Sequence, residues 1–136
     1  AEGQFITDYE VCPTRVADQD LWVPSLEKHR QLFARPPRMA AADAGFASWK
    51  NELAATELGV KRVVLPGASK RSRKKERKRW FRRALRWRTG CEGRISALKR
   101  RHGLRRCRDR GTAGMERWVG LGVIANNLLV LGRAAA

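Results

Sequence analysis

The chain has 136 residues and a formal net charge of +17, so a polyanionic partner is the default expectation. The charge is uneven, because residues 1–67 carry 8 Lys and Arg against 9 Asp and Glu, whereas residues 68–136 carry 22 against 4. Three cysteines without a CxxC pair argue against a disulfide framework and against a structural zinc site. We therefore expect reduced thiols in a cytoplasmic protein.

The first half alternates strand and helix patterns. Residues 5–11 predict a strand, because apolar side chains and acids fall on opposite faces of an extended segment. Asp18 and Asp20 precede residues 21–24, which predict the start of a helix with Pro24 in its first turn, and Pro36 and Pro37 end this helix.

A short apolar strand is predicted next, over residues 38–43, with Asp43 at its carboxyl end. Ser48 is the predicted N-cap of a helix over residues 49–58, and residues 60–65 predict a further strand. This β-α-β-α-β order predicts an α/β layered domain with at least one parallel pair of strands.

The second half is basic and helical in pattern. Residues 69–79 are a charge run, either a disordered tract or a solvated helix. A long helix is predicted to follow as far as His102, with a kink at one of its glycines. Thr112 is the predicted cap of a last helix, whose apolar run over residues 118–131 falls short of the ~20 residues of a membrane span. We expect this helix to be buried in the core, and no membrane partner.

Two carboxylates are candidate metal ligands, and each also has a purely structural interpretation. Asp43, at the end of a central strand, is either a Mg²⁺ ligand or an aspartate that caps the following turn. Glu92 shares one helix face with Arg88 and Lys99. It is either a surface ion-pair partner of Arg88 or a metal ligand beside cations that bind phosphate.

Aromatic residues are interleaved with arginines at the start of the long helix. Trp80, Phe81 and Trp87 could stack on nucleobases, but such a stripe is more often the core side of a basic helix. Binding of a polyanion by the surrounding cations should weaken steeply with salt. His29 and His102 are isolated, and we assign neither a catalytic role.

The spacing of Arg88, Glu92 and Lys99 resembles the Arg, Glu and Lys of the Tyr-Arg-Glu-Lys signature of bacterial insertion-sequence transposases of the DDE class. The words GCEGRISALKRRHGLRRCRDRG and GMERWVGLGVIANNL resemble the C-terminal part of these enzymes. AADAGF, which contains Asp43, resembles the segment with their second catalytic acid, and GQFITDYEV resembles the part between the first and second acids. The resemblance implies an α/β, ribonuclease H-like layered domain that is N-terminally truncated, with a long basic helix and a C-terminal apolar helix.

In this family three acids bind two Mg²⁺ ions, and the enzyme cuts at the element's terminal inverted repeats and joins the 3′-hydroxyl to target DNA. The resemblance makes Asp43 the second acid and Glu92 the third, both catalytic and metal-binding, and it places Arg88 and Lys99 on DNA phosphate. The further DNA-binding candidates are Arg86, Arg94, Arg100 and Arg101. The implied partner is double-stranded DNA, in the nucleoid of the bacterial cytoplasm.

Two positions depart from the family pattern. Leu85 stands where the signature has tyrosine, and nothing in the chain matches the first acid, which should lie on an earlier strand. We therefore expect a partial catalytic domain over residues 1–136, and we predict that it cannot transpose DNA alone. Mg²⁺-dependent DNA cleavage by this chain, abolished by Asp43→Ala, would refute that prediction.

We divide this domain into a β-α-β-α-β part with the second acid (1–67), a basic connecting segment (68–82) and a helical part with the third acid (83–136). A sheet that lacks strands exposes an edge, so we expect aggregation or a homodimer unless something covers it. The alternatives are a basic nucleic-acid-binding module without catalysis, which would hold nucleic acid through residues 70–110, and a basic RNA-binding protein.

Overall fold

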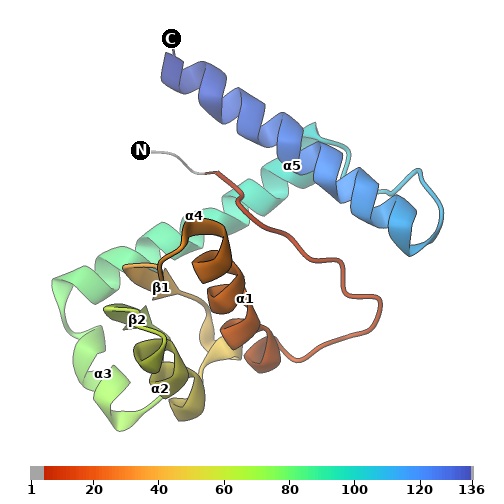
Figure 1. Cartoon of the computed structure of the whole chain (residues 1–136). Coiled ribbons are helices and arrows are strands. Elements are labelled where there is room, and N and C mark those ends of the chain that lie inside the picture. The colour runs from red at the N-terminus through yellow and green to blue at the C-terminus, as the bar shows by residue number, and fades with distance from the viewer. Residues whose placement is uncertain (1–4, 136) are drawn as a thin grey trace. The chain divides into compact units, whose positions relative to one another are not determined.

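The structure, a computed structural model, describes residues 5–135, apart from the side chain of Arg71. Its elements are six helical segments, a short 3-10 helix among them, together with a pair of strands (Figure 1). In chain order they are α1 (Asp18–Phe33), β1 (Met39–Ala41), η1 (Ala44–Phe46), α2 (Trp49–Glu57), β2 (Arg62–Val64), α3 (Lys70–Glu76), α4 (Arg79–Arg101) and α5 (Gly111–Ala135), where η1 is the 3-10 helix.

The chain divides into two compact units within helix α4. The first unit is Arg15–Cys91. The second unit combines the segment up to Thr14 with the residues from Glu92 onward. Each unit has its own internal packing, which is described separately below.

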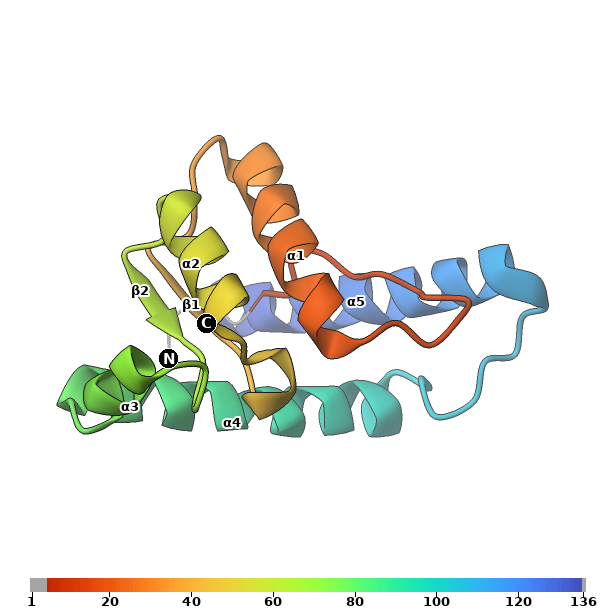
Figure 2. The ribbon, with the colours of Figure 1, turned by 90° about the horizontal axis from the view of Figure 1, so that it is seen from below.

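Strands β1 and β2 of the first unit pair in parallel, with Ala40 opposite Val63 (Figure 2). This pair confirms the predicted α/β pattern of residues 38–65. The strand predicted over residues 5–11 is wrong, since residues 5–11 belong to no strand. The backbone N–H and C=O of Ile6 instead bond to the side-chain amide of Asn127, at 3.0 and 2.8 Å. A side chain therefore satisfies the polar groups that a neighbouring strand would have satisfied.

Apolar side chains cover both faces of β2. On one face, Val63 and Leu65 belong to a cluster with Trp22 and Leu26 of α1 and Ala55 of α2. The preference for β-branched residues and the alternation of successive side chains give β2 a buried row on each side. The helices α1 and α2 therefore form one layer over the two-stranded sheet.

The opposite face of the sheet packs on the start of α4. Val64 of β2 clusters with Phe81 and Ala84, and both Val64 and Phe81 are fully buried. Burial of a side chain as large as phenylalanine is worth several kcal/mol, since its truncation to alanine typically costs about 3–5 kcal/mol. The first two turns of α4 therefore pack on this face of β2.

Helix α1 begins earlier than its proline suggested. Its first residue is Asp18, so Pro24 lies inside the helix and not in the first turn. Ala34, in the left-handed conformation with φ of 54°, forms the C-cap just before the proline pair. The predicted end of this helix is confirmed.

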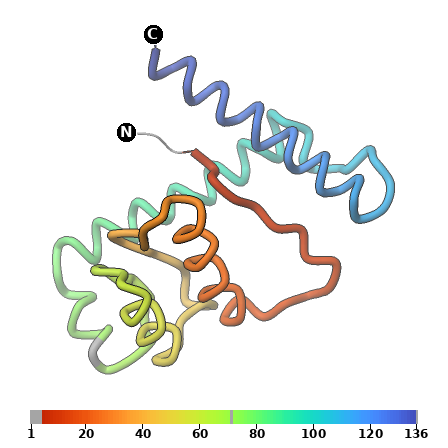
Figure 3. Tube along the Cα trace, viewed as in Figure 1, coloured from red at the N-terminus to blue at the C-terminus, as the bar shows by residue number. Residues whose placement is uncertain are grey.

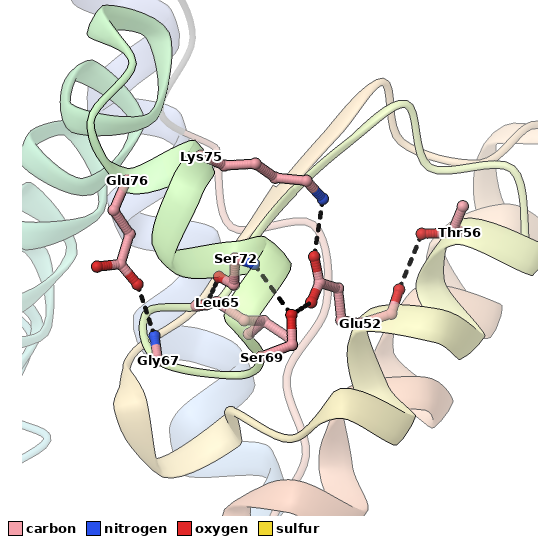
Figure 4. Close-up of polar contacts among 8 residues, drawn as sticks. All are labelled: Glu52, Thr56, Leu65, Gly67, Ser69, Ser72, Lys75 and Glu76. Atoms are coloured by element: carbon pink, nitrogen blue, oxygen red, sulfur yellow. Dashed lines mark hydrogen bonds and ion pairs between the residues drawn. The ribbon is translucent and has the colours of Figure 1, made fainter.

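A buried glutamate joins α2 to α3 (Figure 4). Glu52 is 8% exposed, accepts a hydrogen bond from the Ser69 hydroxyl and forms an ion pair with Lys75, with 2.7 Å from Nζ to Oε1. Ser69 is also the N-cap of α3, because its Oγ accepts a bond from the Ser72 N–H at 3.0 Å. The charge run of residues 69–79 is therefore helical over its first part and fixed by these polar contacts.

Helix α4 runs without interruption through both of its glycines and ends at Arg101. Gly103 follows with φ of 71°, the left-handed conformation that ends helices and that glycine adopts without strain. The predicted long helix, closed by Gly103, is confirmed.

In the second unit, the extended N-terminal segment runs along α5 (Figure 3). Besides the bonds of Ile6 to Asn127, the Tyr9 hydroxyl donates to the Glu116 carbonyl at 3.1 Å. A Cβ atom at Gly120 would lie 2.5 Å from the Tyr9 oxygen, so the contact requires glycine at this position.

The prediction that α5 is a buried core helix is wrong. Its apolar side chains are largely exposed, and Leu121, Ile124 and Leu128 are each more than half accessible. Among the described residues of α5, the buried ones are Gly114, Gly120, Gly122 and Val123, so most of its large apolar side chains remain accessible. By length and composition alone α5 could cross a membrane, which for a single helix is weak evidence.

The polar contacts of Ser69 should be needed for stability. We expect Ser69→Ala to lower the free energy of unfolding by about 1–2 kcal/mol, because it removes a helix cap and a hydrogen bond to a buried carboxylate. Urea unfolding measures this change. Ser25→Ala is the matched control, since its hydroxyl bonds only within α1 at an exposed position, and it should change stability by less than about 0.5 kcal/mol.

The contact between Tyr9 and α5 predicts a difference between two glycine substitutions. Gly120→Ala should displace Tyr9 and increase hydrogen exchange at the Ile6 amide by about fivefold, the equivalent of one lost hydrogen bond. Gly132→Ala has open space for a Cβ and should leave this exchange rate unchanged. Equal rates in the two variants would contradict the observed packing.

Candidate functional site

Asp43 follows β1 directly and begins the turn η1. The Ala42 N–H still bonds to the Val64 carbonyl, at 3.1 Å, so the sheet holds the backbone up to the residue before Asp43. The Asp43 Oδ1 atom accepts a bond from the Gly45 N–H at 3.1 Å, which makes Asp43 the N-cap of η1. The capping role considered from the sequence is therefore present, and it fixes the direction of the carboxylate.

The second oxygen of Asp43 forms an ion pair with Arg88. The distance from Arg88 Nη2 to Asp43 Oδ2 is 2.8 Å, and the aspartate side chain is 42% exposed. Because solvent reaches the carboxylate, the pair contributes at most about 1 kcal/mol to stability. Each carboxylate oxygen has two lone pairs, so Asp43 can still accept another ligand while it is capped and paired.

Gly45 allows a second carboxylate to approach the turn. A Cβ at Gly45 would lie 2.6 Å from Asp18 Oδ2 and 3.2 Å from Asp43 Oδ1. The first residue of α1 therefore places its side chain beside the backbone that Asp43 caps. This part of the unit has a concentration of negative charge next to the guanidinium of Arg88.

Glu92 lies on the exposed part of α4, four residues after Arg88. Residues three and four apart share a helix face, so Glu92 continues the stripe that carries Phe81, Ala84 and Arg88. Along this face, Phe81 and Ala84 pack in the core, Arg88 forms the ion pair with Asp43, and Glu92 is exposed. That Asp43 and Glu92 share a metal site stays a prediction, because they belong to different compact units.

The predicted phosphate-binding cations lie along the same helix. Lys99, Arg86, Arg100 and Arg101 are exposed, whereas Arg88 and Arg94 are partly buried. Exposed cations can reach a polyanion without losing protein contacts, which suits the predicted role. The guanidinium of Arg88 is held by Asp43.

The aromatic stripe has different roles at its different positions. Phe81 is fully buried and belongs to the core, and Trp80 stacks edge-on against it with ring centroids 5.5 Å apart. The guanidinium of Arg62 lies 5.4 Å from the centroid of Trp80. Trp87 is 52% exposed. The core interpretation therefore holds for Phe81 and Trp80.

The donor atoms of Asp43 and Glu92 suit a hard cation. Carboxylate oxygens are the side-chain ligands that Mg²⁺ prefers. Within residues 5–135, however, no group of three or more His, Cys, Asp or Glu side chains gathers around one point. That Asp43 and Glu92 hold Mg²⁺ therefore stays a prediction.

A family model described as a transposase DDE domain matches residues 39–131. The match starts at the first residue of β1 and extends into α5, so it includes Asp43, Arg88 and Glu92. The chain belongs to the transposase DDE-domain family. The resemblance to DDE transposases is thereby confirmed, and membership of this family implies a transposase-related role and binding to DNA. No curated protein and no solved structure matched the chain.

The pairing of Asp43 with Arg88 in this DDE domain was not predicted. Helical spacing offered Glu92 as a partner of Arg88, but it could not reveal Asp43, which is 45 residues away in the sequence. Glu52 and Lys75 were missed for the same reason, since they are 23 residues apart. The serine before α3 was the available signal, because Ser69 stands at an N-cap position.

The two roles of Asp43 can be separated by substitution. Asp43→Asn keeps an oxygen that can accept the Gly45 bond, so it should cost less than about 1 kcal/mol of stability. Asp43→Ala loses the cap and the ion pair and should cost about 1–2 kcal/mol. Urea unfolding of both variants tests this order, and equal losses would show that the charge, not the cap, stabilises the turn.

Proposed function

We propose that this chain contains the second and third metal-binding acids of a DDE transposase, Asp43 and Glu92, within a ribonuclease H-like catalytic domain. The intact enzyme would cut DNA at the terminal inverted repeats of its element and join the 3′-hydroxyl to target DNA. The observation that carries this proposal is the ion pair between Asp43 and Arg88. This ion pair joins the residue that caps the turn after β1 to helix α4, and Glu92 lies one turn further along that helix.

Each residue has a definite part in this proposal. Asp43 and Glu92 would hold Mg²⁺, which supplies Lewis-acid stabilisation of the attacking and leaving oxygens of a phosphodiester. The sheet and the cap at Gly45 orient the Asp43 carboxylate before any ligand binds. Arg88 neutralises that carboxylate, and as a planar cation it can also bind a phosphate oxygen of DNA.

A binding module without metal chemistry is the competing function. The charge of residues 68–136 supports nucleic-acid binding equally in either case. The competing function predicts no preference of divalent cations for Asp43 or Glu92. Metal binding therefore separates the two proposals, whereas the salt dependence of DNA binding does not.

Mn²⁺ can stand in for Mg²⁺ in a direct test, because it broadens the NMR signals of nearby nuclei. We expect titrated Mn²⁺ to broaden the backbone amide signals around Gly45 and Glu92 first. Asp43→Asn and Glu92→Gln should each weaken this effect by roughly tenfold or more, as expected for loss of a ligand.

The matched controls are Asp20→Asn and Glu116→Gln, which remove the same charges at other exposed positions. They should leave the Mn²⁺ response of Gly45 and Glu92 unchanged. Broadening that spreads over all exposed acids, or that falls equally in variants and controls, would contradict a site at Asp43 and Glu92 and would favour the binding module.

A further inference from the structure

A strongly cationic concavity of about 900 Å³ lies in the second unit, after the end of α4. It is formed by the last turn of α4, the loop that follows Gly103 and one tryptophan of α5. Its principal lining side chains are Lys99, Arg100, Arg105, Arg106, Arg108 and Trp118. No aspartate or glutamate of the described chain lines it.

The one acid of the loop is directed to other partners. Asp109 Oδ1 accepts a bond from the Arg110 N–H at 2.9 Å, and Oδ2 pairs with Arg117 at 3.0 Å. The bond from the Arg110 backbone, followed by that from Arg117, holds the pKa of Asp109 below its usual value. Asp109 therefore remains ionised at neutral pH. Its carboxylate pairs with Arg117, which does not line the concavity.

The loop is fixed by contacts that do not use its arginine side chains. The Trp118 indole N–H donates to the Gly103 carbonyl at 3.2 Å, and the Arg106 N–H bonds to the same carbonyl at 3.4 Å. Leu104 packs against Gly122 of α5, where a Cβ would meet its side chain at 3.0 Å. Because these contacts already fix the loop, less conformational entropy is lost when its cations bind a ligand.

Five cations that surround one concavity repel one another unless an anion lies between them. A volume of this size is comparable with pockets for small organic ligands and far exceeds the needs of a single ion. Arginine is the side chain best suited to phosphate, because its planar fork can bind two oxygens. The chemistry therefore favours several phosphates of a polyanion over one isolated charge.

We propose that this basic loop, residues 103–110, together with Lys99 and Arg100, is a second binding site for the backbone of duplex DNA. Arg105, Arg106 and Arg108 bind phosphates there, and Trp118 is a positioning residue that holds the loop through Gly103. Lys99 and Arg100 are already among the predicted DNA-binding residues, whereas the arginines of the loop are not. It rests on the proposed function in that DNA is the substrate, and it requires no metal.

The salt dependence of binding tests this site. In the full chain, with EDTA and a random-sequence duplex, Arg105→Ala, Arg106→Ala and Arg108→Ala are combined in a loop variant. Each lost phosphate contact lowers the slope of log K against log salt by about 0.9, so we expect a decrease of roughly two to three. The control variant combines Arg15→Ala, Arg30→Ala and Arg35→Ala, which removes the same charge at exposed positions of the first unit.

The control variant should keep a slope within about one unit of the unsubstituted chain. Equal decreases in the two variants, or no decrease in the loop variant, would overturn the proposal. Because EDTA removes divalent cations, the result does not depend on Asp43 and Glu92. A decreased slope together with no Mn²⁺ site would support the loop and contradict the proposed catalytic function.

Cys107 lines the same concavity and offers a second measurement on the unsubstituted chain. Duplex DNA should slow alkylation of Cys107 by iodoacetamide at least severalfold, whereas Cys12 is the internal control and should react at its original rate. Inorganic phosphate at the same phosphate concentration should protect much less, because one ion fills little of the concavity. Equal protection by inorganic phosphate, or stronger protection by duplex RNA than by duplex DNA, would contradict a site for duplex DNA.

Discussion

The burial of β2 on both faces is the constraint on which the first unit depends. Val63 and Leu65 pack under α1 and α2, while Val64 packs on Phe81 of α4. A pair of strands alone is only marginally stable, so both helical layers are needed to keep it. Substitutions that loosen Phe81 should therefore disturb the end of β1 as well as the helix.

The same packing prepares the candidate site. The sheet fixes the chain up to Ala42, the Gly45 bond orients Asp43, and the contact of α4 with β2 brings Arg88 within 2.8 Å of that carboxylate. The cations near the candidate site and those of the loop after α4 differ in whether an acid lies beside them. Arg88 is paired with Asp43, whereas the arginines of the loop after α4 surround a concavity that is lined by no acid of residues 5–135.

Much of the local structure of this chain could be predicted from its sequence, because caps and periodicity act over a few residues. Ser48, Gly103 and the parallel pair of strands are confirmed. The extended segment around Ile6 was mistaken for a strand, since its pattern cannot reveal that Asn127, 121 residues away, supplies its hydrogen bonds. The exposure of α5 and the pairing of Asp43 with Arg88 likewise depend on contacts between distant residues.

A crystal structure of the chain grown with Mn²⁺ would test most directly whether Asp43 and Glu92 act together. Anomalous diffraction locates the ion without reference to the protein. If these acids belong to one transposase metal site, an Mn²⁺ peak should lie within coordination distance, about 2.0–2.6 Å, of a carboxylate oxygen from each. A structure in which Glu92 faces away from Asp43, or in which Mn²⁺ binds only to other acids, would contradict the assignment.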